Sequence, residues 1–227
     1  MATGERPSGA AGWGLFAEWH DLIEQRDPRF TWLSTVEEVQ EPLSQLAASL
    51  TVSHWNMQRH WSIASIRSAV LDDERLRRRG VVSRMIIPRR VAEGRCPLAS
   101  SYEPELRLAP VAHPMVVADG RLVVVGDSTG DAVWTSSAPD VVAAAVAFFE
   151  SVWRSAQPAV AEGAQSPYTP RMIRIAILLV DGATDREIAR ALNVSERTVS
   201  AEVREMSRRL GARSRAQAIA LISGADG

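Results

Sequence analysis

The sequence predicts two domains: an α+β domain over residues 1–155, with helices followed by a mixed sheet and a packed C-terminal helix, and an all-α four-helix domain over residues 168–227. Three observations predict this organisation. Short β-rich runs alternate with turn residues between positions 83 and 135. Four helical segments with cap residues follow position 169. Between them, three prolines and a glycine within residues 155–170 interrupt both periodicities, so a linker is expected over residues 156–167.

The basic residues are all arginine: the 227-residue chain has 26 arginines and no lysine. This excludes chemistry that needs lysine, such as a Walker-A phosphate site, a Schiff base or the Asp-Lys constellation of phosphorylated receiver domains. We predict no cofactor and no metal site. The chain has one cysteine, Cys96, no basic-then-apolar leader, and a longest apolar run of only nine residues from Val141 to Phe149. A cytoplasmic protein without a membrane partner is therefore expected.

The N-terminal region is rich in tryptophan and is predicted to be largely helical. The segment GWGLFAEWHDLIEQ places Trp13 or Phe16, Trp19 and Ile23 on one helical face, which is typical of a core or a dimer contact. A second helical region is predicted from about residue 36 to residue 79. Five of the seven tryptophans precede residue 62, so we expect a small-molecule pocket in this half of the chain.

Within this region, Trp55 and Trp61 are the candidate ligand-binding residues. Their neighbours His54 and His60 are six positions apart. On a helix this spacing places the two imidazoles about 240° apart, so we predict helical surface and core rather than a metal site. The arginines at positions 75, 77, 78 and 79 could bind an anionic effector or the DNA backbone. The acidic residues at positions 72–74 favour a solvated helix end instead.

The middle of the chain is predicted to form short strands and a closing helix. Asp119-Gly120 is a strong hairpin signal between two of the strands. A helix from Pro139 to Arg154 places Val142, Val146 and Phe149 on one side. The strands are expected at Ser83–Val91, Glu105–Leu108, Met115–Ala118, Arg121–Gly126 and Ala132–Thr135.

The C-terminal helices are marked by their end signals. Thr169 is a predicted N-cap with Pro170 at the first helical position, and Thr184 begins a capping box that ends at Glu187. Ser195 and Ser214 are the predicted N-caps of the third and fourth helices. The buried stripe of the third helix is expected to comprise Val199, Val203, Met206 and Leu210.

Two short helices joined by a tight turn, with the second longer and basic on its outer face, are typical of a helix-turn-helix. Residues 168–227 carry ten arginines and seven acidic residues, a net charge of +3. A structural four-helix cap would produce the same apolar stripe, so periodicity alone leaves both interpretations open. If the segment binds DNA, the side chains that point into a major groove are those at the outward positions of the third helix: Arg197, Ser200, Ala201, Arg204 and Arg208.

The stretch Thr169–Ile219 resembles the LuxR-type (NarL/FixJ) DNA-binding domain in the motifs GATDREIA (182–189), LNVSERTV (192–199), LG (210–211) and RAQA (215–218). The resemblance implies that the third helix is the recognition helix and that the fourth pairs with its copy in a dimer on a two-fold site. It also implies that Thr184 and Thr198 contact phosphates, whereas Ser200, Ala201 and Arg204 face base edges.

Three departures from the LuxR-type pattern affect this interpretation. Met172 and Arg174 replace an acidic pair, Ser200 stands where lysine is common, and Glu202 stands where histidine is common. Base discrimination should then rest mainly on Arg204, whose guanidinium matches guanine O6 and N7. Glu202 is expected to place a negative charge near the duplex and lower phosphate affinity.

The segments 79–86, 114–119 and 148–153 are similar to a phospholipase-D-like, TrmB-type sensor domain. Active members of that wider fold use His-x-Lys-x4-Asp. Here His113 is followed by Met115 in the lysine position, and Asp119 comes one position early. The resemblance therefore implies a degenerate sensor or dimerisation domain and not an enzyme.

These observations predict a homodimeric transcriptional regulator that binds double-stranded DNA, with a small-molecule effector and RNA polymerase as candidate partners. Two alternatives remain at this point. One is a protein-interaction regulator whose C-terminal domain has lost DNA contact. The other is a phosphodiesterase with a DNA-localising tail, which the missing lysine disfavours.

Overall fold

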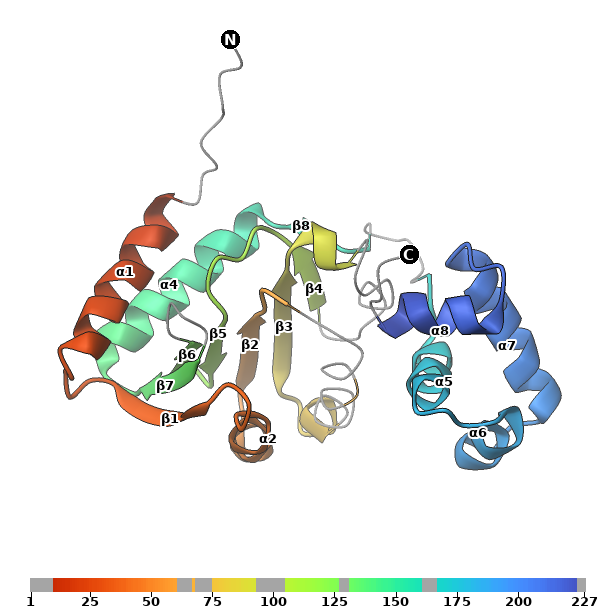
Figure 1. Ribbon diagram of the computed structural model, residues 1–227. Helices are drawn as coiled ribbons and strands as arrows, with labels where there is room; N and C mark the ends of the chain where they lie inside the picture. Colours follow the sequence, from red (N-terminus) through yellow and green to blue (C-terminus); the bar gives the residue numbers. More distant parts are fainter. Residues whose placement is uncertain are drawn as a thin grey trace, which may run out of the picture. The chain divides into compact units, whose positions relative to one another are not determined.

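The computed structural model describes residues 10–60, 67, 75–92, 105–126, 131–160 and 167–223. The chain forms two compact units, each made of separate stretches. The first unit contains residues 1–59, 72–86 and 109–156, and the second contains residues 60–71, 87–108 and 157–227. The predicted fold class is confirmed, because a mixed sheet lies in the N-terminal part and four helices make up the C-terminal region (Figure 1).

The first unit is built on α1 (Ala10–Glu24), β1 (Thr31–Thr35), α2 (Gln40–Ser49), β2 (Ser53–Met57), β3 (Val82–Ile87), β5 (Met115–Ala118), β6 (Leu122–Gly126), β7 (Ala132–Ser136) and α4 (Pro139–Ser155). The second contains β4 (Glu105–Leu108), β8 (Gln157–Pro158), α5 (Pro170–Val180), α6 (Asp185–Leu192), α7 (Glu196–Arg209) and α8 (Arg215–Ser223). None of the described helices is both long and apolar enough to cross a membrane.

The sheet of the first unit has the strand order β1-β7-β6-β5-β2-β3. Strand β2 pairs in parallel with β3 and antiparallel with β5, and the remaining neighbours are antiparallel. A parallel pair requires a crossover connection rather than a hairpin, so the chain between β2 and β3 is long. In the second unit, β4 and β8 pair antiparallel.

Successive apolar side chains of β5 and β6 point to opposite faces of the sheet, so the core of the first unit has two parts. Met115 and Val117 pair with Val125 and Val123, and this face packs against α1 and α4, which lie side by side (Figure 1). The predicted stripe of α1 is confirmed, because Phe16, Trp19 and Ile23 are buried. The other face, which carries Val116, Val124 and Val133, packs against Leu43 and Leu46 of α2.

Two sequence-based expectations for the sheet are wrong. The helical region predicted from residue 36 to residue 79 contains α2, and residues 75–78 are helical, but Ser53–Met57 form strand β2. Pairing with β3 and β5 imposes the extended conformation on a segment whose composition does not favour a strand. The strand predicted to reach Val91 ends at Ile87, where Pro88 lacks the N–H that a ladder needs, and residues 89–92 are helical.

The predicted hairpin at Asp119-Gly120 is confirmed, with φ values of 51° and 62°. The Asp119 carboxylate accepts hydrogen bonds from the backbone N–H of Thr51 (3.0 Å), Val52 (2.8 Å) and Ser53 (2.9 Å). It also accepts one from the Thr51 hydroxyl at 3.0 Å. This single side chain therefore ties the start of β2 to the β5–β6 hairpin.

We expect the first unit to lose stability in acid as Asp119 is protonated. Burial pushes the pKa of this carboxyl upward, but the hydrogen bonds from Ser53, Val52 and Thr51 outweigh it and hold the pKa below its ordinary value of 3.8. Because the folded-state pKa is the lower one, the stabilisation is fully present above the unfolded-state pKa and is lost as the pH falls through the folded-state pKa.

Urea unfolding of the wild type and of Asp119→Asn, measured at a series of pH values, tests this expectation. The difference in unfolding free energy between the two proteins should shrink as the pH falls below about 4. A difference that is the same at neutral and acid pH would assign the effect to another group.

Candidate nucleic-acid interface

The caps predicted for the C-terminal helices are confirmed by their hydrogen bonds. Thr169 accepts from the N–H of Met172 at 3.1 Å, and Ser195 accepts from the N–H of Thr198 at 3.1 Å. Thr184 and Glu187 form a reciprocal capping box. Asn193 adopts a left-handed conformation with φ of 53° and makes the turn between α6 and α7. Together these signals fix the ends of the two helices of the helix-turn-helix.

The apolar stripes of the second unit hold α6 and α7 against α5 (Figure 1). Ile175 and Leu179 of α5, Ile188 of α6, and Val199 and Met206 of α7 are at most 2% exposed. This packing turns the opposite side of α7 to solvent, where Arg197, Ala201 and Arg204 are exposed and Ser200 is half-buried.

The arginines of α7 fall into two groups. Within the described part of the chain, the side chains of Arg197 and Arg204 make no hydrogen bond or ion pair. In contrast, Arg208 donates from Nε and Nη2 to the two carboxylate oxygens of Glu205 at 2.9 and 2.6 Å, and Arg209 donates to the same carboxylate at 2.7 Å. These bonds hold the pKa of Glu205 at about 2. The arginines of α7 that have no partner within the described residues therefore lie in its N-terminal two thirds.

The two predicted phosphate-contacting threonines already use their hydroxyls inside the domain. Thr184 Oγ1 donates to Glu187 Oε2 at 2.7 Å, and Thr198 Oγ1 lies 2.8 Å from Ser195 Oγ. Both residues lie at helix N-termini, where unpaired backbone N–H groups and the helix dipole favour an anion. Their predicted role toward phosphates stays a prediction.

The sequence did not identify the partner of Ser200. Its hydroxyl lies 2.6 Å from Oδ2 of Asp185, at the first position of α6, and Oδ1 of the same carboxylate pairs with Arg215 of α8. The hydrogen bonds from Ser200 and Arg215 lower the pKa of Asp185. In the sequence, an aspartate directly after an N-cap indicates only an interaction with the helix dipole. That Asp185 connects α6 to α7 and α8 is visible only in the tertiary structure.

The expectation that Glu202 places its charge next to the duplex stays a prediction, and the structure pairs this charge within the domain. The Glu202 side chain is only 12% exposed and pairs with Arg171 of α5, whose Nε lies 2.6 Å from Oε1. The second oxygen, Oε2, is buried with no hydrogen-bond partner among the described residues. Glu202 therefore belongs to the contact between α5 and α7.

We expect Arg171→Ala to destabilise the second unit by about 1–2 kcal/mol, because it leaves the Glu202 carboxylate poorly solvated without a cation. Thermal unfolding of the full chain, followed by circular dichroism, measures the change. Arg186→Ala is the matched control, because Arg186 is exposed on α6 and has no partner within the described residues. Equal stability of the two variants would show that the Arg171 pair contributes nothing measurable.

Of the two tryptophans predicted to bind a ligand, the structure describes only Trp55. The ring of Trp55 stacks on Phe149, with 5.1 Å between centroids, and the Arg84 guanidinium lies 5.1 Å from the same ring. These side chains of the chain itself cover Trp55. The helical geometry assumed for the spacing of His54 and His60 is wrong, because His54 lies on β2. Trp61 lies outside the described residues.

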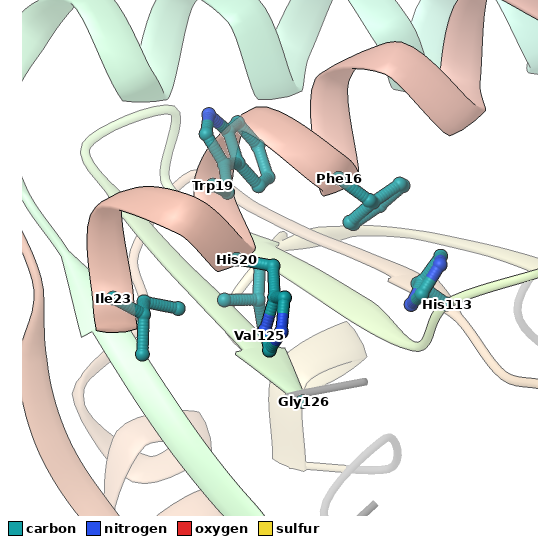
Figure 2. Close-up of a pocket in the computed structure, with 7 residues that line it drawn as sticks. All are labelled: Phe16, Trp19, His20, Ile23, His113, Val125 and Gly126. Carbon is teal, nitrogen blue, oxygen red and sulfur yellow. The ribbon is translucent and has the colours of Figure 1, made fainter. Parts of the chain in front are cut away.

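A small pocket opens instead between α1 and the adjoining ends of β5 and β6 (Figure 2). The His113 ring stacks on Phe16, with centroids 4.6 Å apart and planes inclined by 24°. Burial, followed by the positive charge of Arg59, lowers the pKa of His113. The pocket is partly open and holds about one water-sized group. Its lining residues are Phe16, Trp19, His20, Ile23, His113, Val125 and Gly126.

Comparison with known proteins assigns the C-terminal module. Residues 166–222 match the family model described as bacterial regulatory proteins, luxR family. These residues contain α5, α6, α7 and most of α8. The match supports a DNA-binding transcription regulator. No curated protein matches the chain.

Solved structures give weaker likenesses. TrmBL2, an archaeal chromatin protein whose structure is described as showing a novel mode of DNA binding, is 15% identical over 65% of this chain and 61% of that one, with a TM-score of 0.43. This chain therefore spans about 61% of the TrmBL2 chain. The phospholipase D family member Nuc from Salmonella typhimurium is 15% identical over 52% of this chain and 89% of that one, with a TM-score of 0.43. NucT from Helicobacter pylori is 9% identical over 57% and 99% of the two chains, with a TM-score of 0.48.

Proposed function

We propose that this chain, whose residues 166–222 form a LuxR-type helix-turn-helix domain, is a transcription regulator that binds a two-fold DNA operator as a homodimer in the cytoplasm. The observation that carries the proposal is the outer face of α7. Arg197 and Arg204 are exposed there and have no partner within the described residues, so both guanidinium groups are available to duplex DNA. Ala201 lies between them and leaves room for close approach to base edges.

The proposed organisation keeps residues 1–155 as a sensor and dimerisation domain, residues 156–167 as a linker and residues 168–227 as the DNA-binding domain. The pocket of Phe16, Trp19 and His113 holds only about one water-sized group, so a small-molecule effector would act there by moving α1 away from the sheet. Opening this pocket would displace α1. We propose that this displacement would change how the two chains of the dimer associate. RNA polymerase is a further proposed partner.

A phosphodiesterase function is disfavoured by the roles of two residues. The Asp119 carboxylate is saturated by hydrogen bonds from residues 51–53, and His113 packs against Phe16. The sequence also contains no lysine to bind a phosphoryl oxygen. We expect no hydrolysis of a phosphodiester substrate by the purified chain.

Selection of genomic DNA fragments by the full-length protein at low salt tests the proposed function. We expect enriched fragments that share a sequence with two-fold symmetry, and binding that weakens as salt rises. Mass photometry of the complex should report two chains per operator. If no fragment is enriched, the C-terminal domain has lost DNA contact, and the protein-interaction interpretation replaces this one.

A further inference from the structure

The half-buried hydroxyl of Ser200 has a fixed direction. Ser200 lies on α7 three positions after Arg197 and four before Arg204, so the three side chains share one helical face. Its Oγ lies 2.6 Å from Oδ2 of Asp185, which reaches across from the first turn of α6. The serine therefore faces outward with the arginines while its hydroxyl is anchored to the neighbouring helix.

The chemistry of this contact determines which atom carries the hydrogen. An ionised carboxylate only accepts hydrogen bonds, and a serine hydroxyl has one hydrogen to donate and two lone pairs. Hydrogen bonds from Ser200 and Arg215 favour the ionised form of Asp185 and lower its pKa. The hydrogen of Ser200 is thus committed to Asp185, and what remains for an external partner is acceptor capacity.

We infer that Ser200 is a specificity-determining residue that reads an amino group in the major groove, the N4 amino group of cytosine or the N6 amino group of adenine. The inference rests on the proposed function, because it requires α7 to face base edges. Cytosine offers only a donor at its major-groove edge, whereas guanine offers the acceptors N7 and O6 and thymine the acceptor O4. An acceptor-only serine favours cytosine and adenine over guanine and thymine at the base it meets.

Asp185 acts in this scheme as a positioning residue, because it sets the hydrogen direction of Ser200 without touching DNA. Arg215 pairs with the other oxygen of the same carboxylate and donates to the carbonyl of Ala183 at 3.3 Å. This cation compensates the negative charge of Asp185, so the carboxylate can orient Ser200 without repelling the phosphates. One acceptor serine, together with two arginines that have no partner among the described residues, predicts a half-site that combines guanines with a cytosine or adenine.

The test uses the full-length protein and an operator obtained by selection from randomised duplexes. Ser200→Ala is compared with the wild type in the same selection, which identifies the operator position where the base preference changes. Fluorescence anisotropy then measures affinity for the four duplexes that differ only at that position. We expect the wild type to bind cytosine or adenine there about 3- to 10-fold more tightly than guanine or thymine, as one neutral hydrogen bond provides. Ser200→Ala should reduce this preference below about twofold while keeping its salt-dependent, non-specific affinity.

Asp185→Asn supplies the second arm, because an amide can donate to Oγ and release the serine hydrogen. That variant should gain affinity for the guanine or thymine duplex relative to wild type. Ser207→Ala is the control on the same helix, since Ser207 donates to the carbonyl of Val203 at 2.8 Å. It should leave all four affinities in their wild-type order. Circular dichroism confirms that each variant is folded.

Three results would overturn the assignment. A wild-type preference for guanine or thymine at the position sensitive to Ser200→Ala would show that the hydroxyl donates to the base. Selections by wild type and Ser200→Ala that yield the same sequence would remove Ser200 from base readout while leaving the proposed function intact. Failure of the wild type to enrich any duplex would remove DNA binding itself, and with it this role of Ser200.

Discussion

Replacing Asp119 with alanine is expected to lower the free energy of unfolding of the first unit by about 2–4 kcal/mol. The change removes the acceptor of three backbone N–H groups and one hydroxyl at the start of β2. Charged hydrogen bonds contribute about 1.5–3 kcal/mol each at buried sites, and the exposure of this carboxylate reduces the sum. The substitution also places alanine at a φ of 51°, which is unfavourable for a residue with a Cβ and no local hydrogen bond.

Chemical denaturation of the full chain, with a probe sensitive to the first unit such as tryptophan fluorescence, measures the loss. Asp21→Ala is the matched control, because Asp21 is exposed on α1 and has no side-chain partner within the described residues. Asp119→Gly separates the two causes, because glycine accepts the positive φ and loses only the carboxylate. A loss below about 0.5 kcal/mol in Asp119→Ala would mean that solvent replaces the carboxylate without cost.

Replacing Arg204 with alanine is expected to weaken binding to the selected operator by about 1–3 kcal/mol, or about 5- to 150-fold. The guanidinium is exposed on the outer face of α7 and has no partner within the described residues, so it reaches the groove without first breaking an ion pair. The loss should be concentrated on operators that carry guanine at the contacted position. Anisotropy titrations on operators with each base at that position measure both the affinity and the preference.

Arg208→Ala provides the comparison on the same helix. Both carboxylate oxygens of Glu205 already hold Arg208, so its removal should change operator affinity by less than about threefold. If Arg204→Ala binds every operator like the wild type, Arg204 is not a base-reading residue. If Arg208→Ala has the larger effect, the ion pair with Glu205 opens on binding, and readout extends to the C-terminal end of α7.

The C-terminal domain is predictable from sequence to the level of individual caps. Thr169, Thr184 and Ser195 are confirmed as N-caps because capping is a local interaction that spans three residues. The Asp119-Gly120 hairpin and strands β4 and β5 are confirmed for the same reason, since turn chemistry and short apolar runs determine them.

The remaining features depend on contacts between distant parts of the chain. Strand β2 extends because β3 and β5 flank it, and the sequence SHWNM contains no signal for that arrangement. The role of Asp185 depends on Ser200, 15 positions later, and on Arg215, 30 positions later. The burial of Glu202 depends on Arg171 in another helix. Spacing along one helix predicts which residues share a face, but it does not predict the partner on the neighbouring helix.

Arg208 and Arg209 share the carboxylate of Glu205. This sharing would affect how strongly DNA binding by the domain depends on salt. Two adjacent arginines would ordinarily each displace a condensed cation from the duplex. Here one anion sits between them, so Arg208, Arg209 and Glu205 together carry one net positive charge instead of two. Arg208 and Arg209 would then displace about one condensed cation together instead of two. DNA binding by this helix would then depend less steeply on the salt concentration than two unpaired arginines would make it.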